Sequence, residues 1–398
     1  MLFEIQRKKL ITILGNCLKA IPTNTPLVAL KNFKIVVKQD RVIFFATSDG
    51  NSKITIVKTV HADETLKISS TGMFLVEAKF LDNAIKKMTG DTVKFEMNAD
   101  NLLKVKSDKA KFQINTLAIK NYPKVAIVER KVENKISIAA NILKDGFEST
   151  VFAVYNSLEQ TIGREILRCV YLEINEDNIS FTGTDSYRVS QKTFKTEHND
   201  KQVKLLVHST TVNSLVSIML VSALKEDKNA KIDIYYDNKR VAFCYKDLFI
   251  QSAFDEGTYP MISTIIDKVK HNPMFLKTNR KNMIDIINRS ALFSEDHIQL
   301  CKLVLEDNAF KITSGSQEIG DFEEDLDCTF DFSDTQQFLA VLNASYFLQA
   351  LKAMNAEDVT IYFAPLSDQG YCTNPLYFSE ETDNSEICEI LLPIRTYL

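Results

Sequence analysis

Two periodicities of apolar residues alternate along the chain. Over residues 6–20 the apolar positions recur every three or four residues, which predicts an amphipathic helix with one buried stripe. Elsewhere, short runs are apolar throughout or alternate with polar residues, and many of them end in Thr, Ser, Asp or Gly. Such runs predict strands followed by turns. The pattern therefore indicates an α+β protein with many short strands.

The strand-and-turn pattern occurs at three regularly spaced places. Residues 42–50 (VIFFATSDG) resemble residues 178–186 (NISFTGTDS), and Asp49 and Asp185 are separated by 136 positions. A weaker third copy is found at residues 308–316 (NAFKITSGS). A fixed period of this length indicates a repeated structural unit.

Two longer similarities have nearly the same period. Residues 112–123 and 249–260 both place a Phe ten positions before a Tyr-Pro pair, and the copies lie 137 positions apart. The helical pattern from Glu77 to Met88 resembles that from Asn343 to Met354 at an offset of 266, about twice the same period. We therefore predict three domains, each with two helices and antiparallel sheets, at residues 1–128, 129–268 and 269–398.

The predicted helices are amphipathic and carry an excess of basic residues. They lie at residues 6–20, 78–89, 141–154, 210–225, 280–293 and 344–354, and together hold 13 Lys or Arg and 4 Asp or Glu. The whole chain has a net charge of −4, so the remainder carries −13 against +9 on the helices. In the helix at residues 78–89, the spacing predicts that Phe80 is buried and Asp82 exposed.

Segregated charge suggests one basic surface lined by equivalent helices, with acidic sheets elsewhere. Such a surface would attract phosphate groups without reading a base sequence. No ladder of exposed aromatic residues accompanies it, which favours duplex over single-stranded nucleic acid. Ordinary solvated helix faces are the alternative interpretation.

Signatures of catalysis and metal binding are absent from the sequence. It has no phosphate-binding glycine loop, nucleophile elbow or kinase motif. Its seven cysteines form no CxxC pair and its five histidines no HExxH or HxH motif, which favours reduced thiols and no metal. The acidic run from Asp321 to Asp327 is expected to be a solvated strand end or loop, with a carboxylate metal site as the alternative. No apolar run approaches the roughly 18–20 residues that span a membrane. We therefore expect a cytoplasmic binding protein without a cofactor.

Three short motifs together resemble the bacterial DNA polymerase III beta subunit family, the sliding clamps. They are Thr184-Asp185-Ser186-Tyr187-Arg188-Val189, the Tyr259-Pro260 segment and the terminal Leu391-Leu392-Pro393-Ile394-Arg395, in the family's order. The resemblance covers the whole chain. It implies a non-enzymatic protomer with three domains of the DNA clamp fold, which pairs head-to-tail into a closed ring around duplex DNA with its helices lining the hole.

The resemblance also implies the partners. They are a second copy of the chain, double-stranded DNA bound without sequence preference, the replicative polymerase catalytic subunit, a clamp loader, and other polymerases and repair proteins with a short clamp-binding peptide. The peptide would enter a pocket between the second and third domains. The family's pocket positions are matched by Arg164, Leu167, Thr184, Ser186, Tyr187, Arg188, Val189, Pro260, Ile265, Tyr346, Ile390, Leu392, Pro393, Ile394 and Arg395. Arg188 and Arg395 are expected at its rim, and ordinary core packing is the alternative for the aliphatic members.

Two further sets of residues follow from the resemblance. The ring interface would place Phe112 and Ile114 of the first domain against Leu292 and Phe293 of the third, with core packing as the alternative. The DNA-facing side chains would be Arg7, Lys8, Lys9, Lys79, Lys86, Lys87, Arg280, Lys281, Arg289 and Lys352.

The chain departs from the family's pattern at several positions. The stretch 155–163 before Arg164 is longer than the usual loop, and residues 22–26 lack a basic residue that is often present there. The chain continues for three residues past Arg395, and Ser186 stands where glycine is frequent. Two other functions remain open: a monomeric interaction scaffold built from the same repeat, and a hydrolase with an unrecognised carboxylate site.

Overall fold

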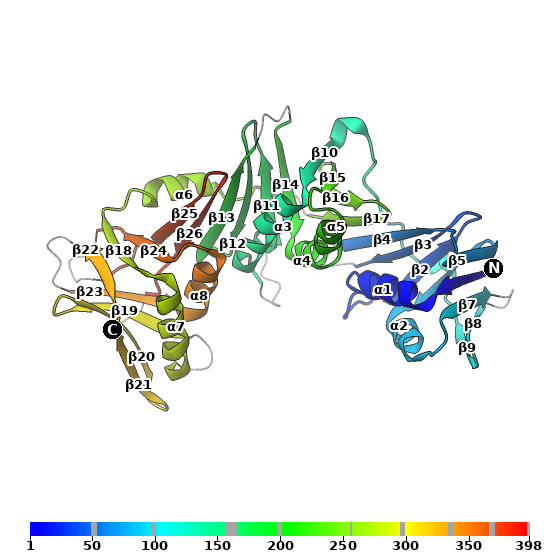
Figure 1. The fold of residues 1–398 in the computed structure, drawn as a ribbon, viewed down its shortest axis with the longest axis horizontal. Helices are drawn as coiled ribbons and strands as arrows, with labels where there is room; N and C mark the ends of the chain where they lie inside the picture. The colour runs from blue at the N-terminus through cyan, green and yellow to red at the C-terminus, as the bar shows by residue number, and fades with distance from the viewer. Residues whose placement is uncertain are drawn as a thin grey trace. The chain divides into compact units, whose positions relative to one another are not determined.

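The computed structural model describes residues 1–48, 54–97, 101–156, 165–196, 201–254, 257–294, 299–332, 337–365 and 371–395. These residues form two compact units. The first contains Met1–Lys144 and Leu206–Glu256, and the second contains Asp145–Leu205 and Gly257–Leu398. Figure 1 shows how strands and helices succeed one another along the chain.

The first unit contains two sheets. Their strand orders are β5-β1-β7-β8-β9 and β10-β15-β16-β17-β4-β3-β2-β6. The strands are β1 (Leu2–Gln6), β2 (Asn32–Val37), β3 (Arg41–Thr47), β4 (Ile54–His61), β5 (Leu66–Ser70), β6 (Gly72–Glu77), β7 (Thr92–Met97), β8 (Leu102–Ser107), β9 (Ala110–Asn115), β10 (Lys135–Ala139), β15 (Lys231–Tyr236), β16 (Arg240–Tyr245) and β17 (Leu248–Ala253).

The second unit also contains two sheets. Their orders are β14-β11-β12-β13-β26-β25-β24-β18-β22 and β21-β20-β19-β23. The strands are β11 (Cys169–Ile174), β12 (Asn178–Thr184), β13 (Arg188–Lys195), β14 (Val203–His208), β18 (Met274–Asn279), β19 (Leu300–Glu306), β20 (Ala309–Ser316), β21 (Gly320–Asp325), β22 (Cys328–Asp331), β23 (Phe338–Asn343), β24 (Asp358–Phe363), β25 (Leu376–Glu381) and β26 (Ser385–Leu391).

All six predicted helices are present, and the described residues contain one further α-helix that was not predicted. They are α1 (Arg7–Leu18), α2 (Ala78–Lys87), α3 (Ala140–Glu148), α4 and α5 (Ser209–Ser214 and Val221–Glu226, joined by a π-helix at Leu215–Leu220), α7 (Arg280–Ser290) and α8 (Ala344–Ala353). The additional helix is α6 (Ile262–Val269), which is too short for a periodic pattern to establish.

The three repeats have the same strand pairing. The ladders are β1-β7-β8-β9 with β6-β2-β3-β4, then β10-β15-β16-β17 with β14-β11-β12-β13, then β18-β24-β25-β26 with β23-β19-β20-β21. Each repeat also has one equivalent backbone hydrogen bond at the start of its first helix. These bonds run from Arg7 N to Asp91 O (2.8 Å), from Ala140 N to Ala230 O (2.8 Å) and from Arg280 N to Glu357 O (2.9 Å). The predicted threefold repeat is therefore confirmed.

Neighbouring repeats share a sheet. Strand β4 of the first repeat pairs antiparallel with β17 of the second, and β13 of the second pairs with β26 of the third. The equivalent strands that remain are β9 in the first repeat and β21 in the third. Each is the last strand of its sheet in the described part of the chain. The first and third repeats therefore each keep one unpaired edge in the described residues, and these are the two kinds of edge that pair at the junctions within the chain.

Helix α2 differs from its predicted burial. Phe80 is 52% exposed, whereas Asp82 is only 4% exposed. The Asp82 carboxylate accepts a 2.6 Å hydrogen bond from Lys86 Nζ, one turn along the same helix. The Phe80 ring meets the Phe112 ring edge-on, with centroids 6.2 Å apart. The prediction was wrong because helical spacing shows which residues share an apolar face, but it does not show how much of that face the core covers.

All seven cysteines are free. Burial raises the pKa of the Cys17 and Cys301 thiols to about 12, which keeps both protonated. Among the described residues, no group of three or more His, Cys, Asp or Glu side chains could hold a metal ion. No helix in the same residues has the length and apolar character that crossing a bilayer requires.

Candidate functional site

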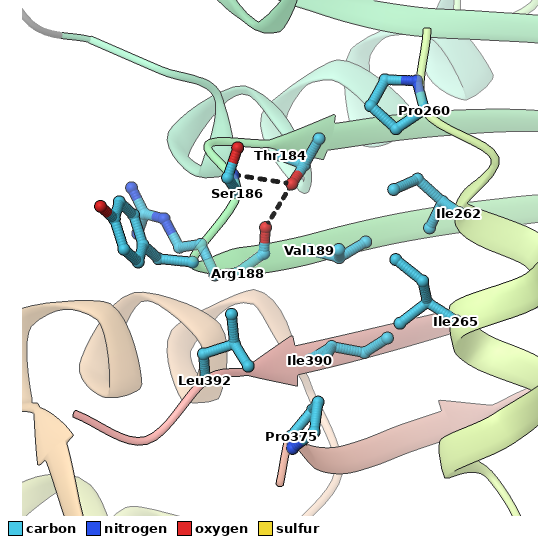
Figure 2. Close-up of a pocket in the computed structure, with 11 residues that line it drawn as sticks. Thr184, Ser186, Arg188, Val189, Pro260, Ile262, Ile265, Pro375, Ile390 and Leu392 are labelled. Carbon is cyan, nitrogen blue, oxygen red and sulfur yellow. Dashed lines mark hydrogen bonds between the residues drawn. The ribbon is translucent and has the colours of Figure 1, made fainter. Parts of the chain in front are cut away.

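An apolar pocket of about 290 Å³ opens in the second unit. Its walls come from the β12–β13 hairpin, the start of α6 and the end of β26 (Figure 2). The described residues that line it are Thr184, Ser186, Tyr187, Arg188, Val189, Pro260, Ile262, Ile265, Pro375, Ile390 and Leu392. Most are aliphatic or proline, so the pocket offers a largely preformed apolar surface.

The turn between β12 and β13 is held by its own polar side chains. The Asp185 carboxylate accepts hydrogen bonds from Tyr187 N (2.9 Å) and Arg188 N (3.1 Å). The Thr184 hydroxyl accepts one from Ser186 N (3.2 Å) and donates one to Arg188 O (2.7 Å), as Figure 2 shows. Short Asp and Thr side chains cap turns in this way. The Thr-Asp-Ser-Tyr-Arg sequence is therefore a self-capped turn that fixes one wall of the pocket.

Ser186 has a φ of 78°, in the left-handed region that favours glycine. A glycine at this turn position would adopt the same φ without the steric cost that a Cβ atom brings. Ser186 is therefore a non-glycine residue that the turn holds under backbone strain.

We expect Ser186→Gly to raise the free energy of unfolding by about 0.5–1 kcal/mol, because relief of the left-handed conformation exceeds the added chain entropy. Urea denaturation measures the change. As a control, Ser69→Gly in strand β5, where φ is not positive, should lower stability. A Ser186→Gly variant that is as destabilised as the control would contradict the strain assigned to this turn.

The guanidinium of Arg188 is held by several groups of the protein. Its Nε donates a 2.9 Å hydrogen bond to Asp185, and its two terminal nitrogens donate to Gln349 Oε1 and Phe152 O. The guanidinium also lies 3.9 Å from the centroid of the Tyr346 ring. With a 7% exposed side chain, this group is buried and bonded within the protein. Arg188 therefore braces the wall of the pocket that it also lines, a structural role that the sequence did not indicate.

The Tyr259-Pro260 segment anchors the opposite wall. The Tyr259 hydroxyl donates a 3.1 Å hydrogen bond to Thr182 O, and its ring stacks on Tyr171 at 4.8 Å. Burial raises the pKa of Tyr259, so the hydroxyl remains a donor. This anchor places Pro260 and the first turn of α6 beside the cavity, where Ile265 is turned toward it (Figure 2).

The end of the chain completes the pocket. Strand β26 pairs with β13, and Ile390 lies opposite Val189. The pairing continues past the strand, because Leu392 N donates a 2.9 Å hydrogen bond to Tyr187 O. Leu392 remains 39% exposed at the mouth of the pocket. The backbone thus holds an apolar side chain partly in solvent, which is typical of a binding surface.

The structure brings most of the predicted pocket residues together. Nine line the cavity: Thr184, Ser186, Tyr187, Arg188, Val189, Pro260, Ile265, Ile390 and Leu392. Five lie elsewhere in the second unit: Leu167, Tyr346, Pro393, Ile394 and Arg395. Arg164 falls outside the described residues. Sequence reasoning missed Ile262 and Pro375. Ile262 could have been found from its i, i+3 spacing to Ile265, whereas nothing in the sequence marks Pro375.

A buried carboxyl lies on the other face of β26 from Ile390. Glu389 is 1% exposed and pairs with Ser190 of β13. The Ser190 hydroxyl oxygen is 2.7 Å from Ser149 O and 2.6 Å from Glu389 Oε1. Because the hydroxyl has one proton and the carbonyl can only accept, the carboxyl must supply the second hydrogen. Burial raises the pKa of Glu389 well above its usual value, and Ser190 and Arg188 oppose this only in part. Glu389 is therefore a neutral acid.

We expect Glu389→Gln to stabilise the protein increasingly as the pH rises. Above its ordinary pKa of 4.5, the unfolded carboxyl loses its proton while the folded one keeps it, so stability falls with rising pH. The slope is at most about 1.4 kcal/mol per pH unit. The amide can donate to Ser190 at every pH, so its gain over the native protein should grow by about 1–3 kcal/mol between pH 5 and pH 8. Urea denaturation at several pH values measures it, and a gain that does not change with pH would contradict the neutral state.

Arg7 and Arg280 occupy equivalent positions in the first and third repeats. Arg7 Nε donates a 2.8 Å hydrogen bond to Gly90 O, and Arg280 Nε donates a 2.6 Å hydrogen bond to Ala356 O. Both carbonyls follow the end of the second helix of the repeat, where backbone acceptors lack helical partners. These guanidinium groups therefore join the two helices of a repeat, a role that the sequence did not predict.

The other predicted DNA-facing residues divide into two sets. Ion pairs join Lys9 to Asp63 (3.1 Å), Lys86 to Asp82 (2.6 Å) and Arg289 to Glu324 (2.5 Å). The second set is exposed and has no ion-pair partner among the described residues: Lys8, Lys79, Lys87, Lys281 and Lys352. Lys8 and Lys281 are each the second residue of the first helix in their repeats. The lysines of this second set are therefore predicted DNA-facing residues whose positive charge is not already offset by a neighbouring carboxylate in the described part of the chain.

The expected division into basic helices and acidic sheets is only partly correct. Strands β7 to β9 carry Lys94, Lys106 and Lys111 directly opposite one another on the solvent face of their sheet. Like charges in this arrangement are destabilising. The expectation failed because the charge of −13 was summed over all residues outside the helices, and this sum hides basic strands such as β7 to β9 behind acidic ones such as β21.

The two unpaired edges carry exposed apolar groups. On the first, Phe112 and Ile114 of β9 are half-buried beside the exposed Phe80. On the third repeat, Leu292 is 72% exposed and the Phe293 ring lies 5.5 Å from that of Phe322 on β21. The core-packing alternative is therefore wrong for Leu292, which has most of its side chain in solvent.

The acidic run Asp321–Asp327 lies on and just after β21. Asp321, Glu323 and Asp325 alternate along the exposed face of the strand. Glu323 pairs with Lys311 at 2.8 Å, and Glu324 pairs with Arg289. This arrangement spreads the carboxylates along an edge instead of converging them on one point.

Comparison with known proteins gives one consistent result. Models of the DNA polymerase III beta subunit match residues 1–126 (N-terminal domain), 138–261 (central domain) and 270–392 (C-terminal domain). The "Beta sliding clamp" of Staphylococcus aureus strain Mu50 is 28% identical over 399 residues, covering 99% of each chain. The crystal structure of the Bacillus subtilis DNA polymerase sliding clamp has a TM-score of 0.85 at 24% identity, with 100% of both chains covered. The DNA polymerase III beta chain of Streptococcus pneumoniae has a TM-score of 0.86 at 20% identity, covering 99% of this chain and 100% of the other.

Proposed function

The chain belongs to the DNA polymerase III beta subunit family of sliding clamps, and from this premise we propose that two copies close head-to-tail into a ring around duplex DNA. The ring would act in the cytoplasm as a non-enzymatic processivity factor that holds the replicative polymerase on its template. Its three domains would be residues 1–128, 129–268 and 269–398.

The pairing of the repeats is the observation that supports this proposal. Within one chain, β4 joins β17 and β13 joins β26, so the two junctions are equivalent to each other: each joins the last strand of one ladder to the last strand of the other ladder in the next repeat. The next junction in this series would join β21 of one copy to β9 of the other. A second copy placed head-to-tail supplies both missing junctions at once, which gives a closed assembly of six repeats in which every β9 and every β21 is paired.

The side chains at the two edges are complementary. The first edge offers Phe80, Phe112 and Ile114, and the third-repeat edge offers Leu292 and Phe293. Charge also differs in sign, because Lys104, Lys106 and Lys111 flank the first edge, whereas Asp321, Glu323 and Asp325 lie on the other. Apolar contact with charge complementarity is typical of a specific interface. The acidic run thereby acquires a role that its sequence alone did not indicate.

The exposed lysines of the helices would touch DNA. Lys8, Lys281 and Lys352 lie on the first and third repeats and have no ion-pair partner among the described residues. Their long side chains carry a point charge, which binds phosphate without reading bases. A closed ring can then retain DNA by topology while these contacts stay weak enough to permit sliding.

Neutralising these lysines should weaken the binding of DNA and its dependence on salt. For the variant Lys8→Gln, Lys281→Gln, Lys352→Gln, the slope of log affinity against log salt should decrease by about 0.9 for each phosphate that the protein no longer neutralises. Fluorescence anisotropy with a short duplex measures the slope. A matched triple at exposed positions outside the helices, Lys38→Gln, Lys109→Gln, Lys124→Gln, should leave it unchanged. Equal changes in both triples would contradict the helix assignment.

The apolar pocket would receive the short peptide of partner proteins. Its aliphatic and proline walls suit a Leu/Phe pair, and Ser186 and Thr184 place polar groups beside them. The proposed partners are the polymerase catalytic subunit, the clamp loader, and other polymerases and repair proteins that carry such a peptide. Of the residues predicted for this site, the nine that line the cavity are the proposed contacts.

Mass in solution separates this proposal from a monomeric scaffold. A ring predicts a species of about twice the 45.2 kDa chain mass, measured by light scattering after size exclusion. A scaffold built from the same repeats, with its β9 and β21 edges unpaired, would run at 45.2 kDa. A monomer at micromolar concentration would contradict a stable ring.

A further inference from the structure

A second pocket, polar rather than apolar, lies in the first unit. Its volume is about 190 Å³. The described residues that line it are Arg41, Val57, Thr59, His61, Arg130, Lys246, Asp247, Leu248 and Phe249. It lies on the face of the eight-stranded sheet opposite helix α1, because Val57, Thr59 and His61 alternate with the residues of β4 that face the helix. Nothing in the proposed ring or peptide site uses it.

Four separate segments bring cationic groups to this pocket. Arg41 of β3 lies directly opposite His61 of β4. The β16–β17 turn is fixed beside them by a 2.9 Å hydrogen bond from Thr59 N to Asp247 O, which places Lys246 at the same edge. The linker before β10 contributes Arg130. Convergence of this kind from distant parts of the sequence requires the folded chain and is unlike a run of surface lysines.

Both arginines of the pocket have N–H groups without a hydrogen-bond partner within the described ranges. The Arg130 guanidinium lies 5.0 Å from the centroid of the Phe249 ring and has no carboxylate partner among the described residues. Stacking of this kind fixes the plane of the guanidinium and leaves its N–H edges available. The Nε of Arg41 is buried without a hydrogen-bond partner, although Asp40 Oδ1 is 3.6 Å away. An unpaired buried donor is costly, and an anion in the pocket would remove that cost.

The acidic groups near the pocket are already paired. Asp247 Oδ1 lies 3.3 Å from His61 Nε2, and Glu226 accepts a hydrogen bond from Lys246 Nζ. Lys246 and Glu226 offset one another, so the cationic groups left to meet a ligand are Arg130 and Arg41, which Asp40 approaches on one side. Asp247 contributes a carboxylate to the same lining and is held on the His61 side of it.

The equivalent place in the next shared sheet provides an internal comparison. There Lys195 N donates a 2.9 Å hydrogen bond to Asn384 O, as Thr59 N does to Asp247 O. By the strand registers, Lys246 corresponds to Asp383 and Arg41 to Glu176. The fold therefore accepts acidic residues at both positions. The cations of the first pocket are a property of that pocket and not a requirement of the junction between repeats.

We propose that this pocket binds the phosphate group of a small anion, either free inorganic phosphate or a nucleoside monophosphate. Two arginines suit a doubly charged oxyanion better than a carboxylate, because the planar guanidinium donates two parallel hydrogen bonds to phosphate oxygens. A cavity of about 190 Å³ accommodates a phosphate group and leaves little room for a larger enclosed ligand. Val57, Leu248 and Phe249 border it without supplying a further polar partner.

Isothermal titration calorimetry of the full-length protein with inorganic phosphate and with AMP, at matched ionic strength in chloride, tests the proposal. We expect saturable binding of one phosphate group per chain. Arg130→Gln and Arg41→Gln should each weaken it by at least about 10-fold, since each removes a charge-assisted donor. Lys34→Gln removes a cation from the same sheet, one that lies 5.6 Å from the Tyr122 ring, and should leave the affinity unchanged.

The two ligands distinguish the source of the phosphate. Tighter binding of AMP than of phosphate identifies a nucleoside monophosphate, and equal or weaker binding identifies the free anion. Absence of saturable binding at millimolar concentrations of both would overturn the proposal, as would equal affinity in the arginine variants and the native protein. Arg130 is exposed, so its variant should fold normally, which circular dichroism checks. None of these outcomes depends on ring formation.

Discussion

Leu392→Asp should weaken binding of a short peptide that carries a glutamine and a Leu/Phe pair by about 100-fold, equivalent to about 2.7 kcal/mol. Leu392 is 39% exposed at the mouth of the apolar pocket, so burial of a bound peptide would cover it. A carboxylate there would remove the apolar surface and would have to be desolvated without a partner. Because the side chain is partly in solvent, the unbound protein should keep its stability.

Fluorescence anisotropy with a labelled peptide measures this effect. Val132→Asp is the matched control, because Val132 is 86% exposed and does not line the pocket. Deletion of residues 392–398 should abolish binding, since it also removes the hydrogen bonds from Leu392 N to Tyr187 O and from Ile394 N to Val341 O. If Leu392→Asp binds as tightly as the control, the pocket is not the peptide site.

Leu292→Asp should raise the dissociation constant of the dimer by about 100- to 1000-fold, because removing a central apolar side chain from an interface costs about 3–4 kcal/mol. Leu292 is 72% exposed in the isolated chain and has no structural function there. On the partner edge, Phe80→Asp removes a ring that is 52% exposed and should have a similar effect.

Sedimentation equilibrium measures the dimer constant of each variant. Val28→Asp is the control, since Val28 is 62% exposed and distant in sequence from both edges. The substitutions at the two edges should not add in full if the side chains touch each other across the interface. A dimer that survives both substitutions unchanged would show that the copies associate through another surface.

The repeat and its helices could be predicted because they depend on local patterns. Three copies of one strand-and-helix order appear at a constant period, and each helix has an apolar stripe that packs on a sheet. The self-capped turn at Thr184–Arg188 could also be recognised, since its polar side chains bond to backbone within a few residues. Both partners of such an interaction lie close together in the sequence, so the interaction can be predicted from a short segment.

The roles that the sequence did not indicate depend on contacts between distant residues. Arg188 donates to Gln349 and to Phe152 O, which lie more than 30 positions away. Arg7 and Arg280, which are predicted to face DNA, each also close a junction with the end of another helix. A residue's type shows that it can donate hydrogen bonds, whereas its partner is fixed only by the fold.

Glu389 shows the same limit for charge. It lies in the part of β26 that is buried on both faces, whereas composition counts it as one of 52 acidic residues. Its protonation follows from the Ser190 hydroxyl, which belongs to another repeat and already donates to Ser149 O. A net charge taken from composition therefore overstates the charge that the folded protein carries.

Retention on circular DNA tests the central claim, that the chain forms a ring around duplex DNA, most directly. The protein is loaded onto a nicked circular plasmid, washed at high salt and then exposed to a restriction enzyme that linearises the plasmid. A ring predicts that the protein stays on the circle despite the salt, because topology and not charge retains it, and that it slides off after linearisation. Equal loss from the circular and the linear DNA at high salt would contradict the ring.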